Sequence, residues 1–208
     1  FVLIKNHMAD IMCIPAFYSK NRHSISEFSL PFYFSSTRFV MRKNESNNIL
    51  AQLSGHSVLV KSGTIYVEQL QKVNVANDLD INIQLDTNNI TAFNELKNGE
   101  YYALISSTVL LKGMIAQTAN PEDYELSDIA LSAPLPAGLL LPLHDKEFKA
   151  FVDGAISSLM TSNEFTALYN KWFQSPIPSK AINLNIPMSD NLKALTAAKK
   201  KISFDYEK

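Results

Sequence analysis

The sequence predicts an α/β protein built as two lobes, and three observations support this prediction. Residues 57–106 alternate short apolar strands with helices, which is the pattern of a parallel sheet with right-handed crossovers. A separate amphipathic helix begins at Lys146. Residues 138–141 form a short apolar run typical of a buried strand. We expect residues 1–39 and 136–208 to form the first lobe and residues 40–135 the second, since the chain leaves one block and returns to it.

In the second lobe the strands are expected at residues 57–61, 81–85 and 101–106, with helices at 64–71 and around 90–96. Ligands of such sheets bind at the carboxyl ends of the strands, where helices begin. Ser62, Gly63 and Thr64 occupy that position after the first strand. Gly63 can bend the backbone, and Thr64 can cap the helix or donate to a ligand. Taken alone, the triplet is a weak signal of a site, and a capped turn without a ligand is the favoured interpretation.

The apolar residues after Lys146 recur at spacings of three and four, as expected for a helix with one face on a core. They are Phe148, Phe151, Val152, Ala155, Ile156, Leu159 and Met160. Ser162 or Asn163 can cap a second helix that ends before Pro176. We interpret Trp172 and Phe173, near the end of that helix, as core residues.

The composition excludes several classes of function. Of the 208 residues 46% are hydrophobic and 19% charged, and the net charge of -1 provides no basic field for nucleic acid. The apolar runs are shorter than the roughly 20 residues that cross a bilayer. Cys13 is the single cysteine, so no intrachain disulfide can form. The four histidines are scattered, and we predict neither a metal site nor a cofactor.

Five short segments together carry a family resemblance. They are residues 28–33, 62–64, 171–178, 183–185 and 188–190. With them the chain resembles the type II periplasmic solute-binding proteins of ABC amino-acid transporters, and within these the glutamate/aspartate-binding subgroup, in order from Val2 to Ala197. The resemblance implies a two-lobed, periplasmic, non-enzymatic monomer that closes on a small acidic solute and delivers it to a membrane permease. It also implies a signal peptide upstream of the present chain.

The resemblance implies a set of ligand-binding residues. Arg22 matches the arginine that grips the ligand α-carboxylate, and Arg38 matches the arginine that binds the side-chain carboxylate, although Ser36 replaces the subgroup's glycine. Ser62, Gly63 and Thr64 match the family's triplet, whose helix N-terminus supplies backbone donors. A guanidinium suits these roles because its planar fork matches a carboxylate. Without the resemblance, each arginine would be interpreted as a surface cation.

Two departures from the family alter the expected ligand. The family's polar Gly-Ser-Thr-Thr run falls at residues 14–17, which end with Phe17, and its ammonium-binding acid pair falls at Ser107 and Thr108. Burying an ammonium without a counter-charge costs on the order of several kcal/mol, so ordinary glutamate should bind poorly. One alternative is an amine-free dicarboxylate or keto acid, with Phe17 packing against its carbon chain. The other is a degenerate sensory or regulatory domain that binds no small molecule.

A third departure concerns the first lobe, which lacks the strand, helix and strand that precede Val2 in family members. We therefore expect this lobe to expose a sheet edge. The sequence contains no positioned acid/base pair and no nucleophile with its base, so we predict that the chain is not an enzyme. His23, beside Arg22, is the one candidate base, and a solvent-facing histidine is the favoured interpretation.

Overall fold

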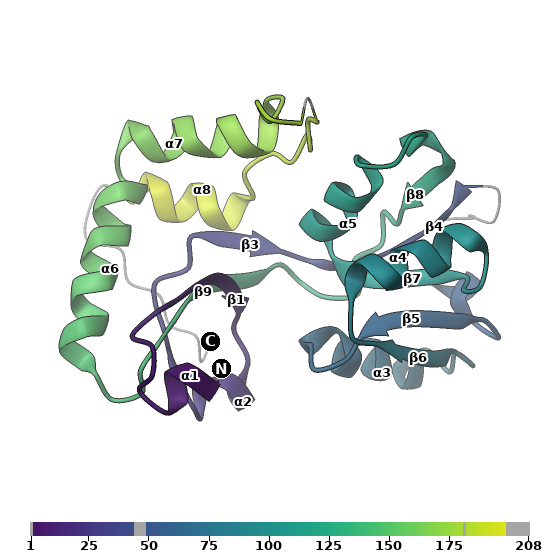
Figure 1. Cartoon of the computed structure of the whole chain (residues 1–208), viewed down its shortest axis with the longest axis horizontal. Helices are drawn as coiled ribbons and strands as arrows, with labels where there is room; N and C mark the ends of the chain where they lie inside the picture. The colour runs from purple at the N-terminus through teal and green to yellow at the C-terminus, as the bar shows by residue number, and fades with distance from the viewer. Residues whose placement is uncertain (1, 44–48, 181, 199–208) are drawn as a thin grey trace. The chain divides into compact units, whose positions relative to one another are not determined.

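A computed structural model describes residues 2–43, 49–180 and 182–198, and the chain divides into two compact units (Figure 1). The first unit comprises Phe1–Ser35 and Leu135–Lys208, and the second comprises Ser36–Pro134. The sequence predicted that the chain would leave the first lobe after residue 39 and return to it after residue 135. Arg38 thus lies in the second unit, on a strand that begins at Thr37. That these units are the two ligand-binding lobes remains a proposal.

The sheet of the first unit is built around one central strand. Strand β9 (Leu135–Leu141) pairs antiparallel with three strands: β1 (Met12–Phe17), β2 (Glu27–Phe28) and β3 (Tyr33–Ser35). Two short helices, α1 (Val2–Lys5) and α2 (Lys20–His23), flank β1 in the chain. Strand β1 pairs only with β9 among the described strands, and its Ile14 is 67% exposed. The first unit therefore has an exposed sheet edge, as expected.

Three longer helices complete the first unit. They are α6 (Lys146–Met160), α7 (Asn163–Tyr169) and α8 (Asp190–Ala197), and a π-helical turn, Asn170–Gln174, follows α7. The Asp145 side chain caps α6 by accepting from the Phe148 N–H at 2.9 Å. The predicted helix after Lys146 is confirmed, but its apolar stripe is narrower than predicted. Phe151 is 74% exposed because α6 buries mainly the side of Val152 and Met160.

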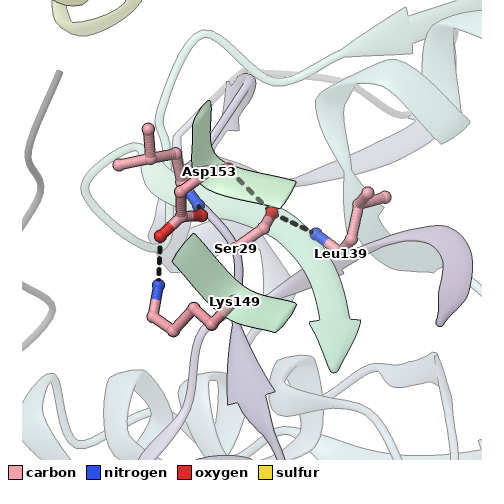
Figure 2. A network of polar contacts seen from close by, with 5 residues as sticks. Ser29, Leu139, Lys149 and Asp153 are labelled. Atoms are coloured by element: carbon pink, nitrogen blue, oxygen red, sulfur yellow. Dashed lines mark hydrogen bonds and ion pairs between the residues drawn. The ribbon is translucent and has the colours of Figure 1, made fainter. Parts of the chain in front are cut away.

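Helix α6 is tied to the strand β2 region by a polar network (Figure 2). The Asp153 carboxylate accepts a hydrogen bond from the Leu30 N–H at 2.6 Å and one from the Lys149 ammonium at 2.5 Å. The Ser29 hydroxyl accepts from the Leu139 N–H at 2.9 Å and donates to the Leu30 carbonyl oxygen. A buried amide without a partner is costly, so this network satisfies backbone that the chain leaves unpaired after β2.

An aromatic cluster joins the end of α7 to the sheet. Phe173 stacks on Tyr33 of β3 and on Tyr169 of α7, with ring centroids 5.2 and 4.6 Å apart. Its neighbour Trp172 is 45% exposed and lies under the Lys171 ammonium. The interpretation of Trp172 as a core residue was therefore wrong. Adjacent positions of a helix point in different directions, so only one of the two rings reaches the core.

The second unit is a five-stranded sheet in the order β6-β5-β7-β4-β8. Its strands are β4 (Thr37–Arg42), β5 (Ser57–Lys61), β6 (Asn82–Asp86), β7 (Ala103–Ser107) and β8 (Tyr124–Leu126). Strands β6, β5 and β7 are parallel, as the strand and helix alternation predicted, whereas β4 is antiparallel to both of its neighbours. The three central residues of β5, Val58 to Val60, are buried, as is typical of a parallel strand covered on both faces.

Three helices connect these strands: α3 (Ile65–Ala76), α4 (Asn89–Asn98) and α5 (Thr108–Ile115). The Asn88 side chain caps α4, and Gly99 ends it with φ +81°. A core forms where α4 and α5 cover the sheet; its buried residues are Val40, Leu59, Ala92, Phe93, Leu96, Leu104 and Leu111. Two 3-10 turns, Leu50–Leu53 and Pro121–Asp123, complete the unit. Throughout the described ranges, every helix is too short or too polar to span a membrane.

Candidate functional site

Several predicted site residues meet at one edge of the second unit's sheet. Strands β5 and β7 are parallel neighbours, with Val60 opposite Ile105, so both end at this edge. The triplet Ser62–Thr64 follows β5, and Ser107 ends β7. The antiparallel strand β4 begins at the same edge. The topology thus brings together the end of β5, the end of β7 and the start of β4, where ligands of α/β sheets bind.

Arg38 lies opposite Ser106 in the pairing of β4 with β7. Its guanidinium is half-buried and donates from Nη1 to the carbonyl oxygen of Ser127. Among the described residues this is its one hydrogen bond. A guanidinium has five N–H donors in a rigid fork, so the contact orients the group and leaves most of its donors for a carboxylate.

Two buried serine hydroxyls lie at the end of β7. Ser106 is 0% and Ser107 1% exposed, and within the described ranges neither Oγ atom has a hydrogen-bond partner. Ser107 is the N-cap residue of α5, yet its side chain does not cap the helix. Since buried polar groups are almost always paired, these two hydroxyls indicate a site that an additional group can satisfy.

Thr108 differs from Ser107 in its contacts. Both its backbone N–H and its hydroxyl donate to the carbonyl oxygen of Ser36, each at 3.0 Å. The hydroxyl proton is therefore used within the protein, although the oxygen can still accept a hydrogen bond. Binding of a ligand by either residue stays a prediction.

Lys112 is a second cation of this region that our sequence reasoning missed. It is half-buried on α5, and burial, together with the positive charge of Arg38, lowers the pKa of its ammonium group. Lys112 follows Thr108 by four residues, which places both on one side of α5. The sequence patterns had given no prediction for residues 108–115. With a helix there, the i,i+4 spacing from Thr108 would have indicated Lys112 as a neighbour of the site.

The triplet after β5 adopts the conformation that its sequence suggests. Gly63 has φ +68°, a left-handed conformation that glycine adopts without strain. Thr64 is the N-cap residue of α3, but its hydroxyl donates to the Lys61 carbonyl oxygen at 2.6 Å instead of capping the helix. Of the two roles left open for the Thr64 hydroxyl, capping of the helix is not observed, because the tight turn at Gly63 brings the Lys61 carbonyl within reach.

The first unit brings Arg22 and Phe17 together. Arg22 lies on α2, half-buried, and its Nη1 donates to the Phe17 carbonyl oxygen at 2.8 Å. The Ser19 side chain caps α2 by accepting from the Arg22 N–H. Phe17 thus positions the arginine through its backbone; packing of its ring against a ligand stays a prediction.

His23, next to Arg22, lies 5.9 Å from Tyr18 between ring centroids. Its Nδ1 atom is buried and lacks a partner among the described residues. The interpretation of His23 as a solvent-facing residue was therefore incomplete, because one edge of the ring is covered. No group of three or more metal-ligating side chains occurs in the part of the chain that the structure describes.

Comparisons with known proteins agree with the fold. The sequence model of the bacterial extracellular solute-binding proteins, family 3, matches residues 1–175. The L-glutamate/L-aspartate-binding protein of Pseudomonas aeruginosa is 30% identical over 196 residues, which are 94% of this chain and 65% of that protein. The glutamate/aspartate import solute-binding protein of Salmonella typhimurium gives the same identity and coverage. The chain thus spans slightly less than two thirds of the length of these curated relatives.

Solved structures show the same fold at lower identity. An ancestral arginine-binding protein bound to arginine superposes with a TM-score of 0.73 at 21% identity, covering 83% of this chain and 75% of that one. The substrate-binding protein of an amino acid ABC transporter gives a TM-score of 0.74 at 17% identity, covering 84% and 75%. The solute receptor for L-cysteine of Neisseria gonorrhoeae gives 0.72 at 19% identity, covering 82% and 66%. These named ligands differ, so the fold does not select one.

Proposed function

Because the chain belongs to family 3 of the bacterial extracellular solute-binding proteins, we propose that it is the extracytoplasmic receptor of an ABC transporter for a small acidic solute. The solute is a glutamate- or aspartate-like amino acid or an amine-free dicarboxylate. The receptor acts in the periplasm and hands its ligand to a membrane permease. It binds its ligand and does not transform it.

The observation that carries this proposal is the environment of Arg38. Its guanidinium is oriented by the Ser127 carbonyl, and the buried hydroxyl of Ser106, which lies opposite Arg38 in the strand pairing, has no partner within the described ranges. A carboxylate accepts from a guanidinium in a bidentate fork and from hydroxyls as well. One carboxylate of the solute therefore satisfies donors that the fold leaves unused.

Arg22 is the second proposed carboxylate-binding residue. Its Nη1 is held by the Phe17 carbonyl, so its orientation is set before a ligand arrives. Preorganised groups bind more tightly because less side-chain entropy is lost on binding. Ser62, Gly63 and Thr64 add backbone donors at the start of α3, whose N-terminus favours an anion.

A second candidate function is a degenerate sensory or regulatory domain without a small-molecule ligand. It is favoured by the residues at the position of the family's acid pair, Ser107 and Thr108, neither of which carries a charge. A pocket that no longer binds a ligand would tolerate the loss of the two negative charges of the acid pair. The unpartnered hydroxyls at the same place argue for a retained ligand, because a decayed site gains by filling such positions with apolar groups.

Thermal unfolding with and without ligands distinguishes the two functions. Ligand at a hundred times its dissociation constant raises the free energy of unfolding by about 2.7 kcal/mol, which shifts the melting temperature measurably. We expect a shift with millimolar glutamate, aspartate, succinate or 2-oxoglutarate. If a cooperatively folded protein shows no shift with any of the four acids, the receptor proposal is wrong and the regulatory one is favoured.

A further inference from the structure

Lys112 lies on the helix that covers the face of the sheet to which Arg38 points. In strand β4 the side chains of Arg38 and Val40 point to one face of the sheet, because alternate residues share a face. Val40 lies opposite Leu104 and joins the core together with Leu111 of α5. Helix α5 therefore covers the face to which Arg38 points, and Lys112 of that helix is near enough for the charge of Arg38 to contribute to the lowered pKa of its ammonium group.

The direction of the lysine side chain places its charge near the start of α5. Side chains on a helix tilt toward its N-terminus, so Lys112 extends toward the turn that contains Thr108. That turn follows directly on Ser107, whose hydroxyl is buried and unpartnered among the described residues. The ammonium and the guanidinium thus share a partly desolvated region with the Ser106 hydroxyl, which lies opposite Arg38 and has no partner among the described residues.

The charges of this region are opposite to those that an ammonium ligand requires. The hydroxyls of Ser107 and Thr108 carry no negative charge, and Arg38 and Lys112 are two cations close enough that the charge of Arg38 contributes to lowering the pKa of the Lys112 ammonium group. Asp128, which follows the Arg38 contact at Ser127, is exposed, and the ion pairs of exposed carboxylates contribute little. A positive group brought here is repelled, whereas a second carboxylate is attracted.

Resting on the proposed function, we propose that Lys112 is a specificity-determining residue, which together with Arg38 and the Ser106 hydroxyl selects amine-free dicarboxylates over amino acids. The solute class is a short dicarboxylic or keto acid with no ammonium group. Lys112 takes part in binding as a cation and in no covalent step.

Two ligands with the same carbon skeleton test this inference. Glutamate and 2-oxoglutarate differ in that an ammonium-bearing carbon is replaced by a keto carbon. Titration calorimetry of the full-length protein with each gives a ratio of dissociation constants. We expect 2-oxoglutarate to bind at least about tenfold more tightly, because one uncompensated charge in a partly desolvated site costs a decade or more in affinity.

Variants of Lys112 test whether this residue causes the preference for 2-oxoglutarate over glutamate. Lys112→Met keeps the length of the side chain and removes the charge, so it should weaken 2-oxoglutarate binding about tenfold and glutamate binding much less. Adding Thr108→Asp to it restores an acid at the family's position and should reverse the preference. Lys72→Met is the matched control, since Lys72 is an exposed lysine of α3 in the same unit, and it should leave both affinities unchanged.

The outcomes separate the inference from the proposed function. If wild-type protein binds glutamate as tightly as 2-oxoglutarate, or if Lys112→Met leaves the ratio unchanged, the role of Lys112 is wrong while an acidic-solute receptor stands. If a cooperatively folded protein binds neither acid and no other dicarboxylate, both proposals are wrong. A collapse of the ratio in Lys112→Met but not in Lys72→Met supports both.

Discussion

In the first unit the Arg22 guanidinium donates a hydrogen bond of 2.8 Å to the carbonyl oxygen of Phe17, five residues earlier in the chain. The contact fixes the arginine against the end of strand β1, while Ser19 caps the short helix that carries it. A charged side chain with a fixed direction is suited to binding a carboxylate, because little side-chain entropy remains to be lost when the ligand binds.

We expect Arg22→Ala to weaken dicarboxylate binding by about two decades or more, since truncating one partner of a buried charge pair costs about 2–5 kcal/mol. Titration calorimetry measures the change. Arg22→Lys keeps the charge but loses the planar fork and should give an intermediate affinity. Asn21→Ala, at an exposed position of the same helix, is the control. Wild-type affinity in Arg22→Ala would exclude the arginine from the site.

Asp153 offers a test of the packing of α6 that is independent of any ligand (Figure 2). Asp153→Ala leaves the buried Leu30 N–H without the acceptor at 2.6 Å, which should lower the free energy of unfolding by about 1–3 kcal/mol. Urea unfolding followed by circular dichroism gives this value. Lys149→Met removes only a partly exposed i,i+4 ion pair and should cost about 0.5 kcal/mol. Equal losses in the two variants would argue against the role of the Leu30 amide.

Two glycine substitutions should change stability in opposite directions. Neither Gly63 nor Gly154 has an atom within 4 Å of an added Cβ, so sterics with neighbours do not distinguish them. Gly63 has φ +68°, and Gly63→Ala should destabilise by about 1–2 kcal/mol. Gly154 lies inside α6, and Gly154→Ala should stabilise by about 0.5–1 kcal/mol. The midpoint of urea unfolding reports both; a shift of the same sign in both variants would contradict the assigned conformations.

The raised pKa of Tyr169 predicts that the protein loses stability at alkaline pH. Burial raises the pKa of its hydroxyl from 10.0 to about 12, and burial also raises the pKa of Tyr33. Below pH 10 both states keep the proton and stability is unaffected. Above it the unfolded state ionises first, so the free energy of unfolding falls by about 1.4 kcal/mol per pH unit for each such group. The decline attributable to Tyr169 lies between about pH 10 and 12.

Urea unfolding between about pH 10 and 12 measures how steeply the free energy of unfolding falls with pH. Tyr169→Phe should make this fall shallower, because the variant has no hydroxyl to ionise at that position. The substitution also removes the hydrogen bond from the Tyr169 hydroxyl to the Pro187 carbonyl oxygen, so its stability at neutral pH serves as the reference. An unchanged alkaline slope in Tyr169→Phe would assign the pH dependence to other groups.

Local patterns predicted much of the fold. The strand at 57–61 and the helix after Lys146 were read from apolar spacing, which depends on the two and 3.6 residue periods of strands and helices. The same patterns failed for Phe151 and Trp172, both largely apolar and both exposed. Whether an apolar position is covered depends on where the neighbouring elements lie, and sequence spacing does not contain that information.

Taken by itself, the sequence determined the alternation of strands and helices and the absence of a basic field. Its resemblance to the family implied the two carboxylate-binding arginines and the loss of the acid pair at Ser107 and Thr108. Only the tertiary structure decided which of these groups meet. Antiparallel pairing set Arg38 opposite Ser106, and packing of α5 on the sheet brought Lys112, 74 residues further along the chain, within range of the charge of Arg38. Such pairings come from strand register and helix packing, which join residues distant in sequence, and it is these contacts that decide the charge presented to a ligand.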